Sequence, residues 1–474
     1  MVIEDFRFVG GLSKEQMNIL HEKALFLAEN VGINIPHKGI LNKLADYNGV
    51  TIEGENVKFK SDLVIKALSE AKYILPAYAN NEWLIDAGAH QTKTYDLETG
   101  KLRESTTEDL LNLIKLGYSY GAVGSAPVVP FDKPTYLQEI FMHKTAYEYS
   151  DRRCNDIFEH MDKSTIPCAN YVYEMAKAAN KWFTFGIWMI SPRTFDRHGL
   201  DVAYYLLDKG VPMYVATMPI AGVTAPINMI STLLQSMFES FSGLTMLNLI
   251  NTKSFSYIPP NDIFEADPFD MKYSTFVYGS SEFIRAQIFK GQLCQYYNVP
   301  YVSKSMNAGG KEADEQSAFE VGTATLITAM LGARVFRTGG CVSACEISSA
   351  EQLVIDYEIV AYVRNLIKSE EFNVDRLMID EIAEVGPGES YISRMSTVKN
   401  FRKEYWEPEL FTHSNLGQWL KYGGKSISKY ANEIARKRIA SFDYQITEGI
   451  KKELDSIYEC AKNDQKLIDS YHSF

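Results

Sequence analysis

Short apolar runs alternate with longer amphipathic segments through residues 122–368. Each run has the length of a buried β-strand, and the segments between runs repeat their apolar positions at helical spacing. Eight strand–helix units in about 250 residues match the arithmetic of a (β/α)8 barrel. We therefore predict an α/β fold built on a TIM barrel. The eight runs are 123–129, 154–158, 183–189, 212–218, 254–258, 273–278, 299–303 and 333–338.

The two ends of the chain follow other patterns. Residues 1–121 contain capped helix starts and helical spacing with a few short strand-like runs, which predicts an N-terminal, mostly helical cap. After a Gly-Pro break at 385–388 the chain is charged and helical in pattern. The predicted domains are thus a cap over 1–121, the barrel over 122–368 and a C-terminal helical extension over 369–474.

Charge and composition narrow the classes of partner. Sixty acidic and 48 basic residues give a net charge of −12, and no Lys/Arg-rich run stands out, so we expect no nucleic acid partner. The longest apolar stretches, near 226–250, are interrupted by polar residues, and no basic-then-apolar leader opens the chain. Six scattered cysteines do not suggest a disulfide framework. We predict a cytoplasmic protein without a membrane partner, and its helical extensions are compatible with a homo-oligomer.

The sequence contains no recognisable metal-binding motif. The eight histidines form no His-x-x-His or His-Glu-x-x-His motif, and no Cys-x-x-Cys pair is present. Cys341 and Cys345 come nearest, because their spacing could place both sulfurs on one helical turn. No third ligand lies nearby in the sequence, so we expect two free thiols and no metal bound by this chain.

Aromatic residues dominate the predicted strand ends. In a TIM barrel the reacting groups come from the carboxyl ends of the strands and from the loops that follow. Aromatic faces attract a quaternary ammonium ion without needing a fixed anion. The alternative is that these rings only fill the barrel interior. We expect at least two of the following to bind substrate: Phe158, Trp188, Tyr257, Tyr278 and Phe336.

A carboxylate on the same substrate would have three candidate partners. His160 follows the second predicted strand, where with Glu159 it could equally form an acid–base pair or a structural hydrogen bond. The turn at Gly222 precedes a predicted helix whose N-terminal donors would face the site, unless it is a plain loop-to-helix junction. Arg337 is the third, but strand alternation allows only one of Phe336 and Arg337 to point inward.

Three sequence blocks together resemble the trimethylamine methyltransferase family of corrinoid-dependent enzymes. The similarity of pattern extends from Leu12 to about Arg438. The resemblance implies a barrel enzyme that moves a methyl group from an amine to the cobalt of a corrinoid (cobalamin) carried by a separate partner protein. The blocks are Met218-Pro219-Ile220-Ala221-Gly222-Val223-Thr224-Ala225-Pro226, Asp314–Glu320 continuing through Leu331-Gly332-Ala333, and Ser349–Asp356.

The substrate implied by this resemblance is a quaternary amine. Founding members of the family carry pyrrolysine, whereas this chain has only ordinary residues and reads Thr338-Gly339-Gly340-Cys341-Val342-Ser343 in the corresponding loop. Members without pyrrolysine act on glycine betaine, proline betaine, carnitine or γ-butyrobetaine, in one-carbon metabolism of the methanogenic or acetogenic type. We rank glycine betaine first and proline betaine second. A quaternary nitrogen leaves as a neutral tertiary amine, so few acid–base residues are needed.

Two other functions remain open from the sequence. A barrel lyase or hydrolase that uses Glu159 and His160 predicts turnover without cobalt. A non-catalytic betaine-binding protein predicts binding without turnover.

Overall fold

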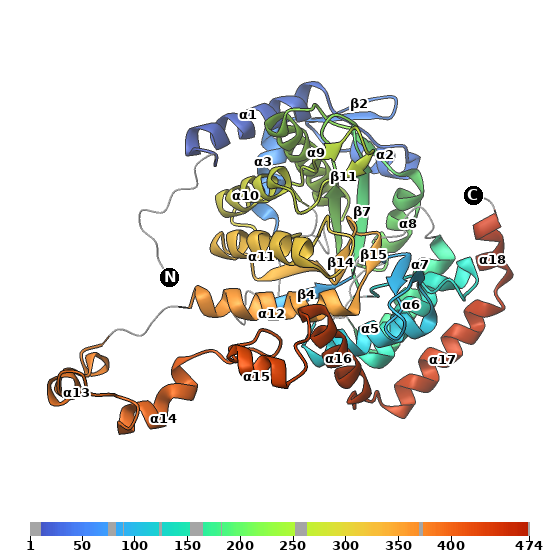
Figure 1. Ribbon diagram of the computed structural model, residues 1–474. Coiled ribbons are helices and arrows are strands. Elements are labelled where there is room, and N and C mark those ends of the chain that lie inside the picture. The colour runs from blue at the N-terminus through green and yellow to red at the C-terminus, as the bar shows by residue number, and fades with distance from the viewer. Residues whose placement is uncertain are drawn as a thin grey trace.

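A computed structural model describes residues 11–73, 82–88, 90–122, 126–151, 165–181, 183–251, 263–368 and 373–472. The fold is mixed α/β, and helices cover most of the short strands (Figure 1). Among the described helices, none combines the length and the apolar composition needed to cross a bilayer.

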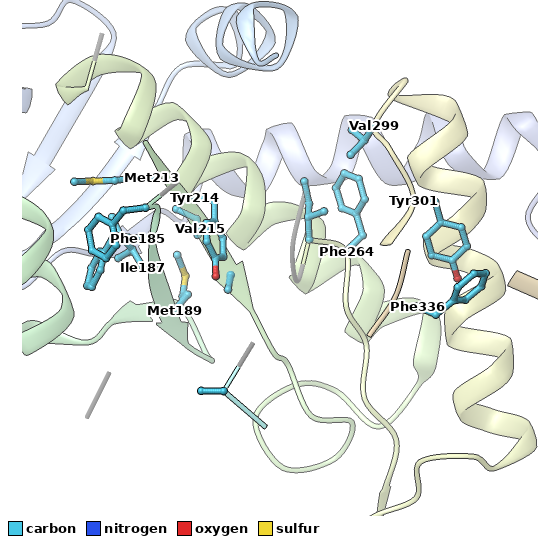
Figure 2. Close-up of a cluster of buried hydrophobic side chains, with 14 of the residues drawn as sticks. Phe185, Ile187, Met189, Met213, Tyr214, Val215, Phe264, Val299, Tyr301 and Phe336 are labelled. Carbon is cyan, nitrogen blue, oxygen red and sulfur yellow. The ribbon is translucent and has the colours of Figure 1, made fainter. Parts of the chain in front are cut away.

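Two parallel strands, β7 and β9, form one end of the largest sheet. Ile187 of β7 pairs with Val215 of β9, and Trp188 pairs with Ala216. Helix α9 packs on one face of this pair, where Gly243 has no side chain because a Cβ there would lie 2.6 Å from Val215. Figure 2 shows Ile187 beside Val215 in the buried cluster. The bounds are β7 (Phe185–Ile190), β8 (Thr194–Phe195), α8 (Arg197–Leu207), β9 (Met213–Thr217) and α9 (Met229–Ile250).

The N-terminal segment adds strands to this sheet. The sheet order is β2-β3-β1-β8-β7-β9, in which β1 joins the N-terminal hairpin to β8. Helices α1 and α3 pack against α9. The bounds are α1 (Lys14–Asn30), β1 (Ile33–Asn34), α2 (Lys38–Ala45), β2 (Val50–Glu53), β3 (Asn56–Phe59) and α3 (Ser61–Glu70).

A second parallel group has the order β12-β13-β4. Strand β4 comes from the segment predicted to be a cap, so that segment contributes a strand beside β13. Isolated parallel bridges join Gln91 to Val128 and Ile220 to Asp267. The bounds are β4 (Leu84–Ala87), α5 (Thr107–Ser119), α6 (Thr135–Tyr149), α7 (Ile166–Ala178), α10 (Ser281–Tyr296), β12 (Val302–Ser303), α11 (Glu315–Met330), β13 (Val335–Gly339) and α12 (Ala350–Leu366).

The predicted strand at 273–278 is wrong as a parallel barrel strand. Its central residues form β11 (Thr275–Phe276), which pairs antiparallel with β10 (Phe269–Asp270) in a two-stranded hairpin. The carboxylate of Asp270 accepts hydrogen bonds from the amides of Lys272 and Tyr273 and so closes the turn. Local β-rich composition does not distinguish such a hairpin from a parallel strand. The predicted runs 154–158 and 254–258 lie outside the described residues.

The loops after β4 and β13 meet in a small sheet of order β14-β15-β5-β6. Its strands are β5 (Lys93–Tyr95), β6 (Leu102–Glu104), β14 (Cys341–Val342) and β15 (Ile347–Ser348). The chain then runs along α12 and leaves the body. Helices α13 and α14 project away from it, whereas α16 returns to α12 and α17 packs on α7 (Figure 1). The remaining bounds are α13 (Ile379–Glu384), α14 (Met395–Glu404), α15 (Leu416–Lys421), α16 (Ile427–Ala440), α17 (Glu448–Lys462) and α18 (Gln465–His472).

Candidate functional site

Four buried charged side chains meet where parallel segments end, and we call them the mouth cluster: Glu265, Asp267, Lys290 and Lys304. The segment that carries both acids is bridged to the chain after β9, because the Asp267 carbonyl accepts from the Ala221 amide at 2.9 Å. Lys304 directly follows β12, and Lys290 reaches in from α10. All four are buried, the most exposed being Lys304 at 7%.

The charges of the mouth cluster compensate one another. Lys290 Nζ forms a short ion pair with Glu265 Oε1. Lys304 Nζ lies 3.8 Å from Glu265 Oε2 and 4.0 Å from Asp267 Oδ2. Gln287 of α10 donates to Glu265 Oε2 at 3.3 Å. The cluster therefore has a net charge of zero, with negative and positive groups available to the two ends of a zwitterion.

Tyr278 borders the mouth cluster. Its ring is buried and stacks on Phe276, with ring centroids 5.2 Å apart. Burial, and next the negative charge of Asp267, raise the pKa of the Tyr278 hydroxyl well above its usual value, while Lys304 acts in the opposite direction. The hydroxyl thus keeps its proton at neutral pH and presents a donor beside an aromatic face.

The loop after β13 has an unusual backbone. Ser343, Ala344 and Cys345 all have positive φ, at 54°, 54° and 69°, although none is a glycine. Such residues cost on the order of 1–3 kcal/mol each and persist where the surroundings hold them. Here the Ser343 amide donates to the Gly310 carbonyl at 2.6 Å, and Cys345 Sγ donates to Asn307 Oδ1 at 2.9 Å. The loop at 343–345 is therefore fixed in shape.

Carboxylates from two helices fasten the loops after β7 and β12. Glu239 of α9 accepts from Ser191 Oγ at 2.6 Å and from the Arg193 amide at 2.9 Å. Burial raises the pKa of Glu239. Glu320 of α11 accepts from the amides at positions 309–310, at 2.7 and 3.2 Å. The helices thus hold the loop backbone as well as covering the strands.

Asp356 of α12 fastens the turn after β13 in the same way. Its Oδ2 accepts from the Gly340 amide at 2.7 Å and its Oδ1 accepts from Gln352 Nε2 at 2.7 Å. Burial raises the pKa of Asp356 to about 7, in spite of these two hydrogen bonds. This residue ends the third block that resembles the methyltransferase family, so that block contains a determinant of loop shape.

Among the aromatic residues predicted from sequence, the structure describes Trp188, Tyr278 and Phe336. Trp188 is half-buried, and strand alternation puts it on the face of β7 opposite Ile187 and therefore away from α9. Phe336 is fully buried against Trp83, with ring centroids 5.5 Å apart. Figure 2 shows the Phe336 ring beside Tyr301. Phe158, Glu159, His160 and Tyr257 lie outside the described residues.

Arg337 lies on the face of β13 opposite Phe336. Its Nε lies 3.5 Å from Asp86 Oδ2 on the neighbouring strand β4. Phe336 pairs with Ser303 across the β12–β13 ladder, so alternation places Arg337 and the residue after Ser303, Lys304, on the opposite face. Two cations therefore share one side of these strands.

The backbone amides of the turn at Gly222 donate to carbonyls of the same turn. Gly222 has φ of +79°, and its N–H donates to the Ala225 carbonyl at 2.8 Å. The Val223 amide donates to the Ile220 carbonyl at 3.0 Å. The following helix begins only at Met229, where the side chain of its N-cap residue accepts from two first-turn amides. These donors are occupied, so the loop-to-helix alternative fits this turn better than a carboxylate-binding role.

Neither acid of the mouth cluster is among the residues predicted from the sequence. Glu265 and Asp267 occur at alternate positions in the run Ile263–Pro268. Acidic residues spaced by two in an otherwise apolar run were the available signal, because they place both carboxylates on one face of an extended segment. A strand predicted at 273–278 leaves the run at 263–268 unassigned.

The two nearby cysteines are free and have different partners. Cys341 Sγ accepts from Gln91 Nε2 at 2.8 Å, whereas Cys345 turns to Asn307. Within the part of the chain that the structure describes, no three His, Cys, Asp or Glu side chains are grouped as metal ligands would be.

The family and the relatives found by comparison with known proteins all carry methyltransferase names. The chain matches the family model described as trimethylamine methyltransferase (MTTB) over residues 1–463. It is 23% identical over 432 residues to a glycine betaine methyltransferase of Desulfitobacterium hafniense, covering 86% of this chain and 88% of that protein. A proline betaine:corrinoid methyltransferase of Eubacterium limosum is 22% identical, covering 84% and 86%. Trimethylamine methyltransferase MttB of Methanosarcina barkeri is 26% identical but covers only 47% and 44%.

Proposed function

The chain belongs to the trimethylamine methyltransferase (MTTB) family, and from this premise we propose that it transfers a methyl group from a quaternary amine to the cobalt of a corrinoid carried by a partner protein. The relatives that align over more than four-fifths of their length are a glycine betaine and a proline betaine methyltransferase. Glycine betaine is therefore the first substrate to test and proline betaine the second.

The architecture proposed for this reaction is a closed (β/α)8 barrel. The β7–β9 pair, the β12-β13-β4 group and the bridges from Gln91 to Val128 and from Ile220 to Asp267 are all parallel, as barrel strands are. We keep 1–121, 122–368 and 369–474 as the proposed cap, barrel and extension, with β4 as a strand that the N-terminal part lends to the barrel. The active end is then the end that carries the mouth cluster.

The observation that supports a betaine is the neutral, buried mouth cluster beside Tyr278. A betaine is itself a zwitterion. Its trimethylammonium group would lie against the aromatic faces of Tyr278 and Trp188 and near the Asp267 carboxylate. Its carboxylate would be bound by Lys304, whose buried ammonium is worth more to an anion there than a lysine in water would be. His160 stays a second candidate for the carboxylate.

Methyl transfer from a quaternary amine needs little acid–base chemistry from the protein. The partner's Co(I) corrinoid would supply the nucleophile. The carbon–nitrogen bond of the substrate would break with its electron pair left on nitrogen, so the amine would leave as a neutral tertiary amine. This chain orients the methyl group, excludes water and balances the substrate charges. A protonated Tyr278 suits that role because a phenolate would compete as a methyl acceptor.

A substrate panel tests the proposal. The purified chain is mixed with Co(I) cobalamin and with glycine betaine, proline betaine, carnitine, choline or trimethylamine, and the loss of the Co(I) absorbance is followed. We expect glycine betaine to react fastest and to yield one equivalent of dimethylglycine, measured by mass spectrometry. Consumption of betaine without cobalt would instead support a lyase or hydrolase that uses Glu159 and His160. Binding without turnover in every mixture would support a betaine-binding protein.

A further inference from the structure

Residues 373–409, which we call the arm, expose apolar side chains and have no core of their own. None of these residues is buried. Two short helices without a buried face are not stable in isolation, since helices of this length depend on packing. The apolar side chains of the arm that are at least half exposed are Val374, Ile379, Ile382, Ile392, Met395, Val398, Phe401 and Tyr405.

The contacts inside the arm are polar. Arg394 pairs with Glu384 at 3.0 Å, and Ser396 donates to Glu381 at 2.6 Å, so α13 and α14 meet through charged and hydroxyl groups. This is the reverse of an ordinary helix pair, which buries its apolar face and exposes its polar one. An exposed apolar surface of this size marks an interaction site.

The base of the arm lies at the end of the strands away from the mouth cluster. Trp406 lines a cavity of about 620 Å³ together with Trp83 and Arg364. Trp83 directly precedes β4, and the guanidinium of Arg334, directly before β13, lies 5.1 Å from the Trp83 ring centroid. A corrinoid must reach the opposite, carboxyl end of the strands to accept a methyl group. The base of the arm is thus remote from where the corrinoid partner is needed.

The charges of the arm are self-complementary. Residues 373–389, the acidic half, contain five acidic residues and one arginine, a net charge of −4, and residues 390–403, the basic half, contain four basic residues and no acid, a net charge of +4. Residues 404–409, at the base of the arm, add three acidic residues outside these two halves. When two identical surfaces meet across a two-fold axis, each half of one arm faces the other half of its partner. The acidic half would then lie on the basic half in both directions.

A cavity at the base of the arm offers further apolar surface. It has a volume of about 1040 Å³ and lies between the end of α14 and the chain around α15. Aromatic residues make up much of its lining, and these are Phe401, Tyr405, Trp406, Trp419, Tyr422 and Tyr430. Such rings serve as anchor sites in protein interfaces.

We propose that the arm packs on the arm of a second copy of this chain and forms a two-fold symmetric dimer, at the end of the body away from the mouth cluster. The apolar side chains of both arms supply the dimer core, and the acidic and basic halves set its orientation. The aromatic cavity receives side chains of the partner's arm.

Sedimentation velocity of the full chain at several concentrations tests this dimer. We expect the wild type to be a dimer, or an even-numbered assembly built from dimers, and Ile392→Asp/Met395→Asp to halve its mass. Both positions are exposed in the single chain, so the body should keep its fold, and the far-UV circular dichroism should lose no more than the signal of the two arm helices. The matched control is Ile19→Asp/Ile65→Asp, which adds the same charge at exposed positions on α1 and α3 and should leave the mass unchanged. A monomeric wild type, or a variant of unchanged mass, would overturn the proposal.

A charge-reversal pair tests the orientation and the identity of the occupant. Lys399→Glu/Lys403→Glu and Asp380→Lys/Glu389→Lys should each weaken the dimer, and mixing the two should restore it. A mixture that stays monomeric contradicts the acid-on-base arrangement. Hydrogen exchange provides the second measurement: residues 373–409 should be protected in the wild type alone. Protection that arises only when the corrinoid protein is added would overturn the proposal, because the occupant would then be that partner. Neither measurement depends on turnover, so the dimer and the methyl transfer can fail separately.

Discussion

Lys304→Met gives the sharpest test of how the mouth cluster binds substrate. The change keeps an unbranched side chain of similar length and removes one buried positive charge. In the proposed complex that charge faces the betaine carboxylate. Two unit charges about 4 Å apart interact by about 4 kcal/mol at the effective dielectric constant of such sites, and part of this is lost to desolvation. A net loss of about 2–4 kcal/mol in kcat/KM corresponds to a reduction of roughly 30- to 1000-fold.

The assay compares two substrates in the same variant. The kcat/KM for glycine betaine is measured with Co(I) cobalamin, and the affinity for choline, which lacks the carboxylate, is measured by calorimetry. Lys304→Met should weaken glycine betaine alone, and Lys304→Arg should recover part of the loss. Lys290→Met is the matched control, because it also removes a buried cation beside Glu265 but acts from α10. Equal losses for both compounds in Lys304→Met would refute the assignment and leave Lys304 a structural role.

Three further predictions follow from other parts of the site. Burial raises the pKa of Asp356 in the folded chain to about 7. The free energy of unfolding should therefore be highest below about pH 4 and should fall by at most about 4 kcal/mol as the pH rises toward 7. Asp356→Asn should lack this decline in urea unfolding measured across that pH range. Trp188→Leu and Tyr278→Leu should each weaken betaine binding in calorimetry by about 3- to 30-fold, because a cation–π contact contributes about 0.5–2 kcal/mol, whereas Phe336→Leu should lower the melting temperature and leave betaine affinity unchanged. Gly222→Ala should destabilise the chain by about 1–3 kcal/mol in urea unfolding, since φ is +79° and the new Cβ would lie 2.5 Å from the Met271 methyl carbon.

Each of these outcomes has a clear opposite. An unchanged pH profile in Asp356→Asn would mean that the carboxylate titrates near its ordinary pKa. Weaker betaine binding in Phe336→Leu than in Trp188→Leu would reverse the two assignments. A Gly222→Ala variant of wild-type stability would mean that the turn at 220–225 relaxes without cost.

Sequence patterns predicted strands well where a strand is a self-contained apolar run. The runs at 212–218 and 299–303 contain β9 and β12, and the runs at 183–189 and 333–338 overlap β7 and β13, each of which ends one residue later. Strand β4 was not predicted because Leu84–Ala87 is short and pairs with β13, where Leu84 lies opposite Val335 far along the chain. Local composition carries little information about such distant pairing, which tertiary packing decides.

The candidate site was predictable only in part, for a related reason. Tyr278 and Lys304 occur in the segments expected at strand ends, but their partners Glu265 and Asp267 come from a run whose pairing was not recognised. The choice between Phe336 and Arg337 could not be made from alternation alone. It depended on Tyr301 and Trp83, which identify the side of the strands that packs against hydrophobic neighbours.

The neutrality of the mouth cluster also limits how this enzyme could change substrate in evolution. Its two acids and two lysines come from three separate segments of the chain, so a single mutation leaves an odd buried charge. A descendant that accepts an amine without a carboxylate would have to lose Lys304 and an acid together, or pass through a less stable intermediate. Substrate preference at this site should therefore change by paired substitutions, and a library designed to redirect it should vary positions 265, 267, 290 and 304 jointly.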